Sequence, residues 1–283
     1  MDPTALGPPL DVRPLLAPER SALLELLGDL PDDDWSRPTP CPRWSVHELV
    51  LHLVHDDLRR LSFQRDGHAG AVIRPASSLD ELAAALDEAN EAWVAASAPT
   101  VSPELACGLV AWLAEPSERH LAGLPPDEAE STVAWAGPGS HPNWLDVARE
   151  YTERWVHHQQ LRQAVDRPGL AGPRFLAPVL ETFARGLPAQ LPAAPEGTVA
   201  ELRVVGAVRR AWTVAVRDGS WRFTGSGSRP DAFLELSAEA LWRRAVRMAR
   251  RHETSADAVS SGPKPLVEAL LDLRGAIVGA ATR

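Results

Sequence analysis

The sequence predicts an α+β protein in which a helical N-terminal region precedes a small module of strands and helices. Over the first two thirds, apolar side chains recur at helical spacing in segments that proline-rich stretches separate. From Thr198 the pattern changes to short runs rich in β-branched and aromatic residues, and Asp218-Gly219 between two of these runs is a hairpin signal. We therefore expect two domains, residues 1–190 and 191–283.

Helices separated by breaks are expected in the N-terminal region. Ser45, followed three residues later by Glu48, forms a capping box that should start the second of them. Prolines and glycines predict that residues 116–139 form a long loop with one short strand around Val133. The expected helices span residues 15–30, 45–61, 79–96, 103–113, 142–165 and 173–187, and residues 188–197 form a linker.

The C-terminal module is expected to alternate between the two kinds of element. Its β-branched and aromatic runs predict strands, and the apolar spacing of its later segments predicts helices. The expected strands span residues 199–205, 212–216, 221–224 and 233–236, and the expected helices span residues 238–250 and 265–278.

Composition narrows the classes of function. The chain has 29 basic and 38 acidic side chains and a net charge of −9, which argues against a nucleic-acid partner. No run approaches the roughly 20 apolar residues that cross a bilayer, so no membrane partner is expected. Cys41 and Cys107 are too few for a disulfide framework, which indicates a reduced, cytoplasmic protein, expected to be a monomer or homodimer. Between two prolines, Cys41 is interpreted as a packed turn residue.

A carboxylate and an imidazole point to a metal ion. Glu153 and His157 are four residues apart within the expected helix 142–165 and should lie one turn apart on one face. Such a pair suits Zn²⁺ and other first-row divalent ions. Two ligands are too few, so a third should come from the second helix, which offers the histidines at positions 47, 52 and 55.

Spacing alone leaves this site open. An acid–histidine pair at this spacing is more often a solvated ion pair than a metal site. The main apolar stripes also do not single out His52 or His157 as interior ligands, and His158 lies nearer to its stripe than His157 does. A lone histidine on such a stripe is commonly a core residue with a hydrogen-bonded ring, which is the alternative interpretation of His158.

Two blocks of sequence resemble the mycothiol-dependent maleylpyruvate isomerase family. The first is residues 35–46, running on to His52, and the second is residues 135–140, continuing to Glu153 and His157. This family belongs to the DinB-like superfamily of metal-binding four-helix bundles, and the C-terminal module resembles the sterol-carrier-protein-like domain often attached to it. The resemblance implies that His52, Glu153 and His157 are the three metal ligands.

The resemblance also implies a chemistry. Three ligands leave a metal position open, where a thiol would bind as thiolate. The family's isomerase adds mycothiol thiolate across the cis double bond of maleylpyruvate, permits rotation and eliminates the thiol to give fumarylpyruvate. Related bundles transfer such a thiol to electrophiles. We therefore expect a Zn²⁺-dependent, mycothiol-using isomerase or S-transferase acting on a small electrophilic or anionic substrate.

Arginines are the expected contacts for an anionic substrate. Arg154, Arg162 and Arg222 are the candidates, of which Arg154 and Arg222 are preferred as catalytic residues. Asp56, one turn after His52, is expected either to orient that histidine or to be a plain surface acid.

Two alternatives stay open. One is a biosynthetic or hydrolytic metalloenzyme that uses no thiol, and the other is a non-catalytic metal-binding protein. Residues 158–162 depart from the common family pattern, in which a small residue and then an aspartate follow the ligand histidine.

Overall fold

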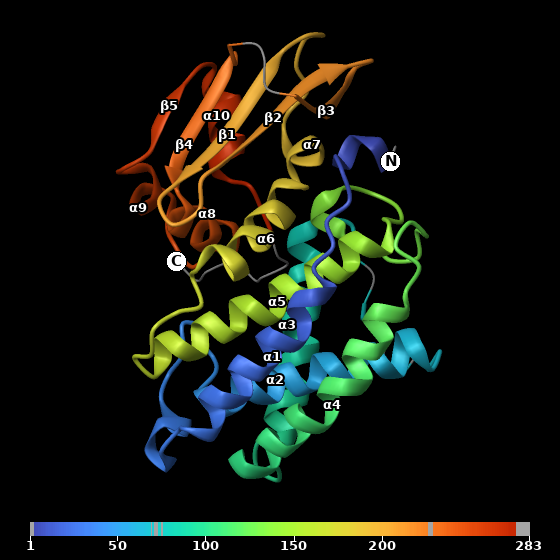
Figure 1. The fold of residues 1–283 in the computed structure, drawn as a ribbon, viewed down its shortest axis with the longest axis vertical. Coiled ribbons are helices and arrows are strands. Elements are labelled where there is room, and N and C mark those ends of the chain that lie inside the picture. Colours follow the sequence, from blue (N-terminus) through green and yellow to red (C-terminus); the bar gives the residue numbers. More distant parts are fainter. Residues whose placement is uncertain (1–2, 69, 71–72, 75, 226–228, 276–283) are drawn as a thin grey trace. The chain divides into compact units, whose positions relative to one another are not determined.

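The computed structural model confirms the α+β class. It describes residues 3–68, 70, 73–74, 76–225 and 229–275. The chain forms two compact units, one helical and one built around a β-sheet (Figure 1). The helical unit consists of Val12–Leu124 and Glu150–Leu170, and the sheet unit consists of Met1–Asp11, Pro125–Arg149 and Ala171–Arg283. The expected boundary between residues 190 and 191 stays a prediction.

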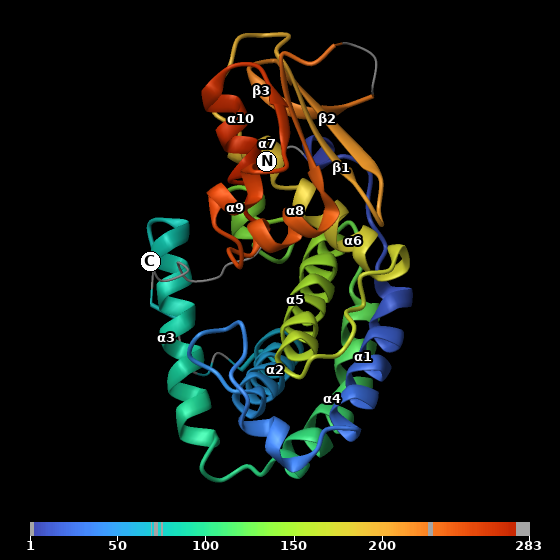
Figure 2. The same ribbon diagram turned by 90° about the vertical axis from the view of Figure 1, so that its left-hand side faces the viewer.

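Most expected helices of the N-terminal region form close to their predicted bounds. Figure 2 shows those of the helical unit, α1 to α4 and the later turns of α5. Their bounds are Arg13–Gly28 for α1, Val46–Arg60 for α2, Leu79–Ser97 for α3, Pro103–Gly123 for α4 and Asn143–Ala164 for α5. A 3₁₀ turn, Asp32–Ser36, precedes α2, and a π turn, Leu61–Arg65, continues it. No helix in the described ranges is long and apolar enough to cross a membrane.

The start of α2 is set by the predicted capping box. The Ser45 side chain accepts a hydrogen bond from the backbone N–H of Glu48, and the Glu48 carboxylate accepts one from the backbone N–H of Ser45 at 2.8 Å. From this start, α2 packs into an apolar core made with α1, α4 and α5. Buried members of that core from the other helices include Leu23, Leu27, Val110, Leu113 and Leu161.

The predicted loop over residues 116–139 was wrong in its first part, because α4 continues through Pro116 to Gly123. Proline lacks the N–H that would bond to the carbonyl of Trp112, four residues earlier. The side chain of Trp112 is 68% exposed, so this carbonyl lies on the face of the helix that water reaches. On the opposite face Leu113, Ser117 and Leu121 are buried, and their packing stabilises the turns on both sides of the proline.

The sheet unit holds a five-stranded sheet in the order β3-β2-β1-β4-β5. β1 and β4 are parallel, and the other neighbours are antiparallel. The strands are β1 Val199–Val205, β2 Arg210–Arg217, β3 Ser220–Thr224, β4 Ala232–Ser237 and β5 Val259–Ser261. The helices are α6 Pro173–Ala184, α7 Leu187–Gln190, α8 Ala238–Ala245, α9 Arg251–Ser255 and α10 Lys264–Leu271.

The predicted hairpin is confirmed. Asp218 and Gly219 both have positive φ, 51° and 73°, as a two-residue turn between antiparallel strands requires. The turn places Arg217 opposite Ser220 and thereby sets the register of β2 against β3.

Four other expectations for the sheet unit were wrong. The helix expected over residues 238–250 is shorter than predicted: α8 ends at Ala245, Arg247 adopts a left-handed conformation with φ of 58°, and the next helix, α9, begins only at Arg251. The strand expected around Val133 is a 3₁₀ turn, Ala134–Ala136. The last helix ends at Leu271, and residues 276–278 of its predicted span lie outside the described residues. Part of the expected linker is helical, since α7 ends at Gln190.

Candidate metal centre

The structure brings the three predicted metal ligands together inside the helical unit. His52 lies on α2, and Glu153 and His157 lie on α5. The Nε2 atoms of the two histidines are 3.2 Å apart, and their rings meet edge to face. Glu153 Oε2 lies 3.8 Å from His157 Nε2. Both histidines are 5% exposed, so their facing nitrogens lie in a largely water-free interior.

The helical wheel was a poor guide to these positions because neither helix has only one buried face. Besides its main stripe, α2 buries Leu51 and His52 on another side. On α5, nearly every side chain from Asn143 to Leu161 is buried or half-buried. A helix that is enclosed on most sides can direct polar side chains into the interior from outside its main apolar stripe.

Burial keeps both imidazoles uncharged. It lowers the pKa of His157 to about 4. Burial also lowers the pKa of His52 well below its ordinary value, and the neighbouring His157, His55 and Arg59 lower it further. A metal ion binds the neutral form of imidazole, so both side chains are in the state that ligation requires at pH 7.

The spacing of the two imidazoles fits a divalent metal ion. Two nitrogens at about 2.0–2.1 Å from a tetrahedral Zn²⁺ would lie about 3.3–3.4 Å apart, close to the observed 3.2 Å. Glu153 is a looser third donor at 3.8 Å. Accordingly, within the described ranges no group of three or more His, Cys, Asp or Glu side chains already has the arrangement of a metal site. The donor types fit the ion, with the carboxylate farther out than the imidazoles.

Asp56 is a fourth polar group at this point that the sequence did not identify as a donor. Its Oδ2 lies 3.3 Å from Nε2 of His52, the nitrogen that faces His157. The expected orienting contact would have been made to Nδ1, which is buried and has no hydrogen-bond partner within the described part of the chain. Burial and the nearby Glu150 and Glu153 carboxylates raise the pKa of Asp56 well above its ordinary value. Its i, i+4 spacing from His52 was the available sequence signal.

The other histidines of this region have separate surroundings. His55 stacks on Trp93 with ring centroids 4.6 Å apart, and His47 packs against the edge of Trp35. His158 is fully buried, with its Nδ1 2.8 Å from Glu19. The interpretation of His158 as a core histidine with a hydrogen-bonded ring is therefore confirmed.

Arg154 lies in a buried network of charges. Its Nη2 donates to Asp57 Oδ1 at 2.6 Å, and Arg20 donates to the other oxygen of the same carboxylate at 2.6 Å. Asp57 and Glu150 raise the pKa of Arg154 although burial opposes them. The side chain is 5% exposed and its known partners are carboxylates of its own chain. Its expected contact with a substrate stays a prediction that this geometry does not favour.

The other two candidate arginines lie elsewhere. Arg162 donates to Nε2 of His158 at 2.9 Å and to the backbone carbonyl of Pro168, so it supports the core histidine. Arg222 lies on β3, paired in register with Ala215 of β2, and belongs to the sheet unit. Its role as a substrate contact stays a prediction.

Cys41 is a packed turn residue, as expected, and it also contacts the ligand helix. Thr39 Oγ1 accepts a hydrogen bond from the Cys41 backbone N–H at 3.1 Å, and Cys41 Sγ lies 3.0 Å from Gln160 Oε1. Burial raises the pKa of the thiol to about 12, so it stays protonated at neutral pH. A buried, protonated thiol is a poor nucleophile.

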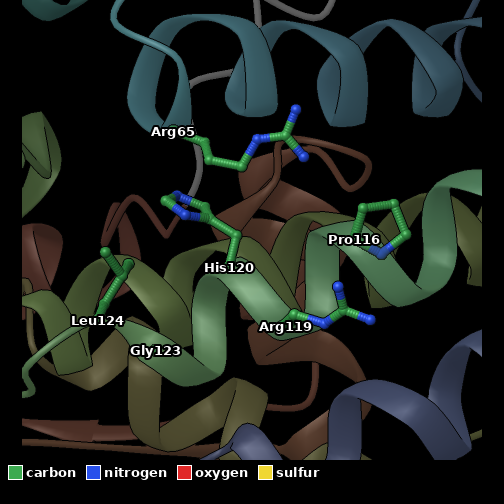
Figure 3. Close-up of a pocket in the computed structure, with 6 residues that line it drawn as sticks. All are labelled: Arg65, Pro116, Arg119, His120, Gly123 and Leu124. Atoms are coloured by element: carbon green, nitrogen blue, oxygen red, sulfur yellow. The ribbon is translucent and has the colours of Figure 1, made fainter.

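A separate pocket of about 310 Å³ lies beside the C-terminal turns of α4 (Figure 3). Its lining residues are Arg65, Pro116, Arg119, His120, Gly123 and Leu124. Arg65 forms an ion pair with Asp66, and Arg119 with Glu115. Neighbouring acids thus neutralise its arginines, and it contains none of the predicted site residues.

The fold and the site define a class, the α+β proteins in which a helical bundle presents imidazole and carboxylate donors from facing helices. Comparison with known proteins gives the family within it. Residues 16–162 match the family model described as the mycothiol maleylpyruvate isomerase N-terminal domain. The chain belongs to this family, and the matched segment contains all three predicted ligands.

A solved structure has a similar fold. The chain aligns with the crystal structure of a histidine-to-alanine mutant of the mycothiol-dependent maleylpyruvate isomerase, at a TM-score of 0.52 and 14% sequence identity. The alignment covers 90% of this chain and 93% of that one. At this identity the likeness concerns the fold, which extends over both units of the chain.

Relatives in sequence are uncharacterized proteins from two strains of Mycobacterium tuberculosis. Each is 29% identical over 164 residues, which is 57% of this chain. The match spans 60% of the length of these relatives.

Proposed function

We propose that this chain is a metal-dependent enzyme that uses a low-molecular-weight thiol, mycothiol, as an isomerase or S-transferase. The observation that carries the proposal is the pair of uncharged, buried imidazoles whose Nε2 atoms lie 3.2 Å apart, with Glu153 beside them. Membership of the mycothiol maleylpyruvate isomerase N-terminal domain family supports the thiol. Zn²⁺ is the ion we propose, because it accepts imidazole and carboxylate ligands together.

The chain's own residues would hold and shield the reacting groups. His52 and His157 would supply the nitrogen donors and Glu153 an oxygen donor. The ring of Trp44 lies 4.6 Å from that of His52 and covers it, which limits the access of water. A divalent ion bound here would lower the pKa of a coordinated thiol and so supply a sulfur nucleophile at neutral pH.

The proposed isomerisation needs no oxidant or reductant. Sulfur forms a bond to one carbon of a cis double bond, and the electron pair moves to the neighbouring carbon. Rotation about the resulting single bond follows, and the carbon–sulfur bond then breaks to release the thiol and the trans product. An S-transferase would share the first of these steps and keep the carbon–sulfur bond.

A Co²⁺-substituted protein provides the test. Titration with mycothiol should produce a sulfur-to-metal charge-transfer band in the absorption spectrum. A spectrum that stays unchanged at saturating thiol would contradict thiol use. The His52→Ala protein, which lacks one donor, is the matched control and should show no band.

One observation favours a second candidate, a metal-binding protein without thiol chemistry. Asp56 Oδ2 lies 3.3 Å from His52 Nε2, close enough for a fourth side chain to complete the coordination. Four protein ligands are typical of structural sites, whereas catalytic sites keep a position open. Under this alternative, Asp56→Ala would open the site to thiol, and the band would appear only in that variant.

The cell compartment is also a proposal. Both cysteines, Cys41 and Cys107, are free. We infer a reducing, cytoplasmic location, which is where a low-molecular-weight thiol would be maintained in its reduced form.

A further inference from the structure

Gln160 lies directly behind His157 on α5. Its Oε1 is 2.8 Å from Nδ1 of His157, on the side of the ring away from the nitrogen that faces His52. The same Oε1 is 3.0 Å from Sγ of Cys41, which comes from the turn before α2. The amide oxygen of Gln160 therefore links α5 to the turn before α2. Gln160 is 2% exposed and His157 is 5% exposed, so little water competes for these contacts.

Both neighbours of Oε1 favour the observed orientation of the amide. A carbonyl oxygen has two lone pairs and accepts two hydrogen bonds. The Cys41 thiol is protonated and can donate, and His157 can donate when its proton is on Nδ1. If the amide were turned round, its N–H groups would face a weak sulfur acceptor and would require the His157 proton to move to Nε2. The oxygen-inward orientation satisfies both neighbours, and it leaves a lone pair on Nε2.

We propose that Gln160, held in place by the Cys41 thiol, is a positioning residue that keeps the proton of His157 on Nδ1 and so directs the Nε2 lone pair toward His52. This inference rests on the proposed function only in so far as Nε2 is a metal donor. The tautomer itself is a property of the metal-free protein. Hydrogen bonds to the far nitrogen of a ligand imidazole fix its ring and tautomer in this way.

The neutral amide has a further consequence. A carboxylate in this place would make the imidazole more basic and add a negative charge behind it. Gln160 fixes the ring without adding charge to the donor cluster, which is formed by His52, His157, Glu153 and Asp56. Gln160 can therefore orient His157 without changing the charge of the metal site.

The first test measures the tautomer in metal-free protein by ¹⁵N NMR of the histidine rings, with His157 assigned by the loss of its signals in His157→Ala. Wild-type protein should carry the His157 proton on Nδ1. Gln160→Met, which has a similar length but no acceptor, should shift His157 substantially toward the Nε2 tautomer. Gln159→Met is the matched control, because Gln159 is also buried but accepts from the backbone N–H of Leu170. A wild-type proton on Nε2, or an unchanged tautomer in Gln160→Met, would overturn the proposal.

The second test measures Zn²⁺ affinity by competition with a chelator. Loss of such a contact typically weakens metal binding by about 10- to 100-fold, which is expected for Gln160→Met and not for Gln159→Met. Gln160→Glu retains an acceptor oxygen and should rescue the affinity. Cys41→Ser retains a donor and should behave more like wild type than Cys41→Ala does. Equal affinities for Gln160→Met and wild type would count against the proposal.

The two tests separate the inference from the proposed function. Wild-type protein that binds no metal, yet loses the Nδ1 tautomer in Gln160→Met, would refute the proposed function and leave the positioning role of Gln160 standing. If wild-type protein binds metal but the His157 tautomer is unchanged in Gln160→Met, the positioning role of Gln160 is refuted and the proposed function stands.

Discussion

The Arg154 guanidinium lies 2.6 Å from Oδ1 of Asp57, and both side chains are at most 5% exposed. Asp57 follows His52 by five residues on α2, and Arg154 precedes His157 by three on α5. The ion pair therefore links the two helices close to the donor cluster. Because Asp57 also accepts from Arg20 of α1, one buried carboxylate connects three helices of the helical unit.

Replacing Asp57 should strongly destabilise the helical unit. Asp57→Asn leaves the guanidinium groups of Arg20 and Arg154 buried without their shared counter-charge, and breaking such a pair costs about 3–5 kcal/mol. Urea unfolding measures the loss in free energy of unfolding. Glu115→Gln is the control, because Glu115 is 79% exposed in its pair with Arg119 and should contribute no measurable stability. If Asp57→Asn and Glu115→Gln lowered the free energy of unfolding equally, burial of the ion pair would not explain the loss.

Metal content should depend on His52 and His157 and not on a nearby histidine. Purified wild-type protein is expected to carry about one divalent ion per chain by elemental analysis, since the helical unit offers one set of metal donors, His52, Glu153 and His157. His52→Ala and His157→Ala should lose most of it. His47→Ala, on the same helix as His52 but packed against Trp35, should retain it. Full retention by both ligand variants would refute the site.

Arg222 should affect substrate binding and leave the metal centre unchanged. A bidentate contact to a carboxylate contributes about 1.5–3 kcal/mol, so Arg222→Ala should raise KM for maleylpyruvate by about 10- to 100-fold. Metal content and the spectrum of the Co²⁺ protein with thiol should be those of wild type. An unchanged KM would contradict the predicted substrate contact of Arg222.

His55 should make the stability of the metal-free protein depend on pH. Burial against Trp93, together with the charge of Arg59, lowers the pKa of His55 to about 4, below the ordinary 6.5 of the unfolded chain. Between these values the unfolded state binds the extra proton, so this contribution is fully present above about pH 6.5 and falls away toward pH 4. Urea midpoints from pH 7 to 4 should fall less steeply in His55→Gln than in wild type. Parallel curves would contradict the assignment.

The helices were predictable where their signals are local. The Ser45–Glu48 capping box and the Asp218-Gly219 turn involve neighbouring residues only, and both formed as expected. The extension of α4 through Pro116 depends on core packing that lies outside the helix itself. β5 could not be recognised because its three residues are exposed and carry no alternating pattern.

The candidate site was likewise predictable only where its signals are local. Glu153 and His157 follow from helical spacing, whereas His52 was chosen over His47 and His55 by family resemblance. Gln160 and the actual contact of Asp56 depend on how α2, α5 and the turn before α2 pack together. Sequence spacing alone does not contain that information.

The protonation states of Asp56 and Glu153 determine the net charge of the donor cluster. Burial and the nearby carboxylates favour the protonated form of Asp56 in the metal-free protein, whereas a bound divalent ion would favour its ionised form. With both carboxylates then ionised and both imidazoles neutral, their two negative charges would match the ion, and the loaded site would be electroneutral. An incoming thiolate would then leave it with one unit of negative charge in a poorly solvated interior, where such a charge acts strongly. An uncharged electrophile would meet no repulsion there, while a dicarboxylate would need a cationic partner to approach. The preference of the site for neutral or anionic substrates thus depends on the charge of Asp56, which lies one helical turn after His52.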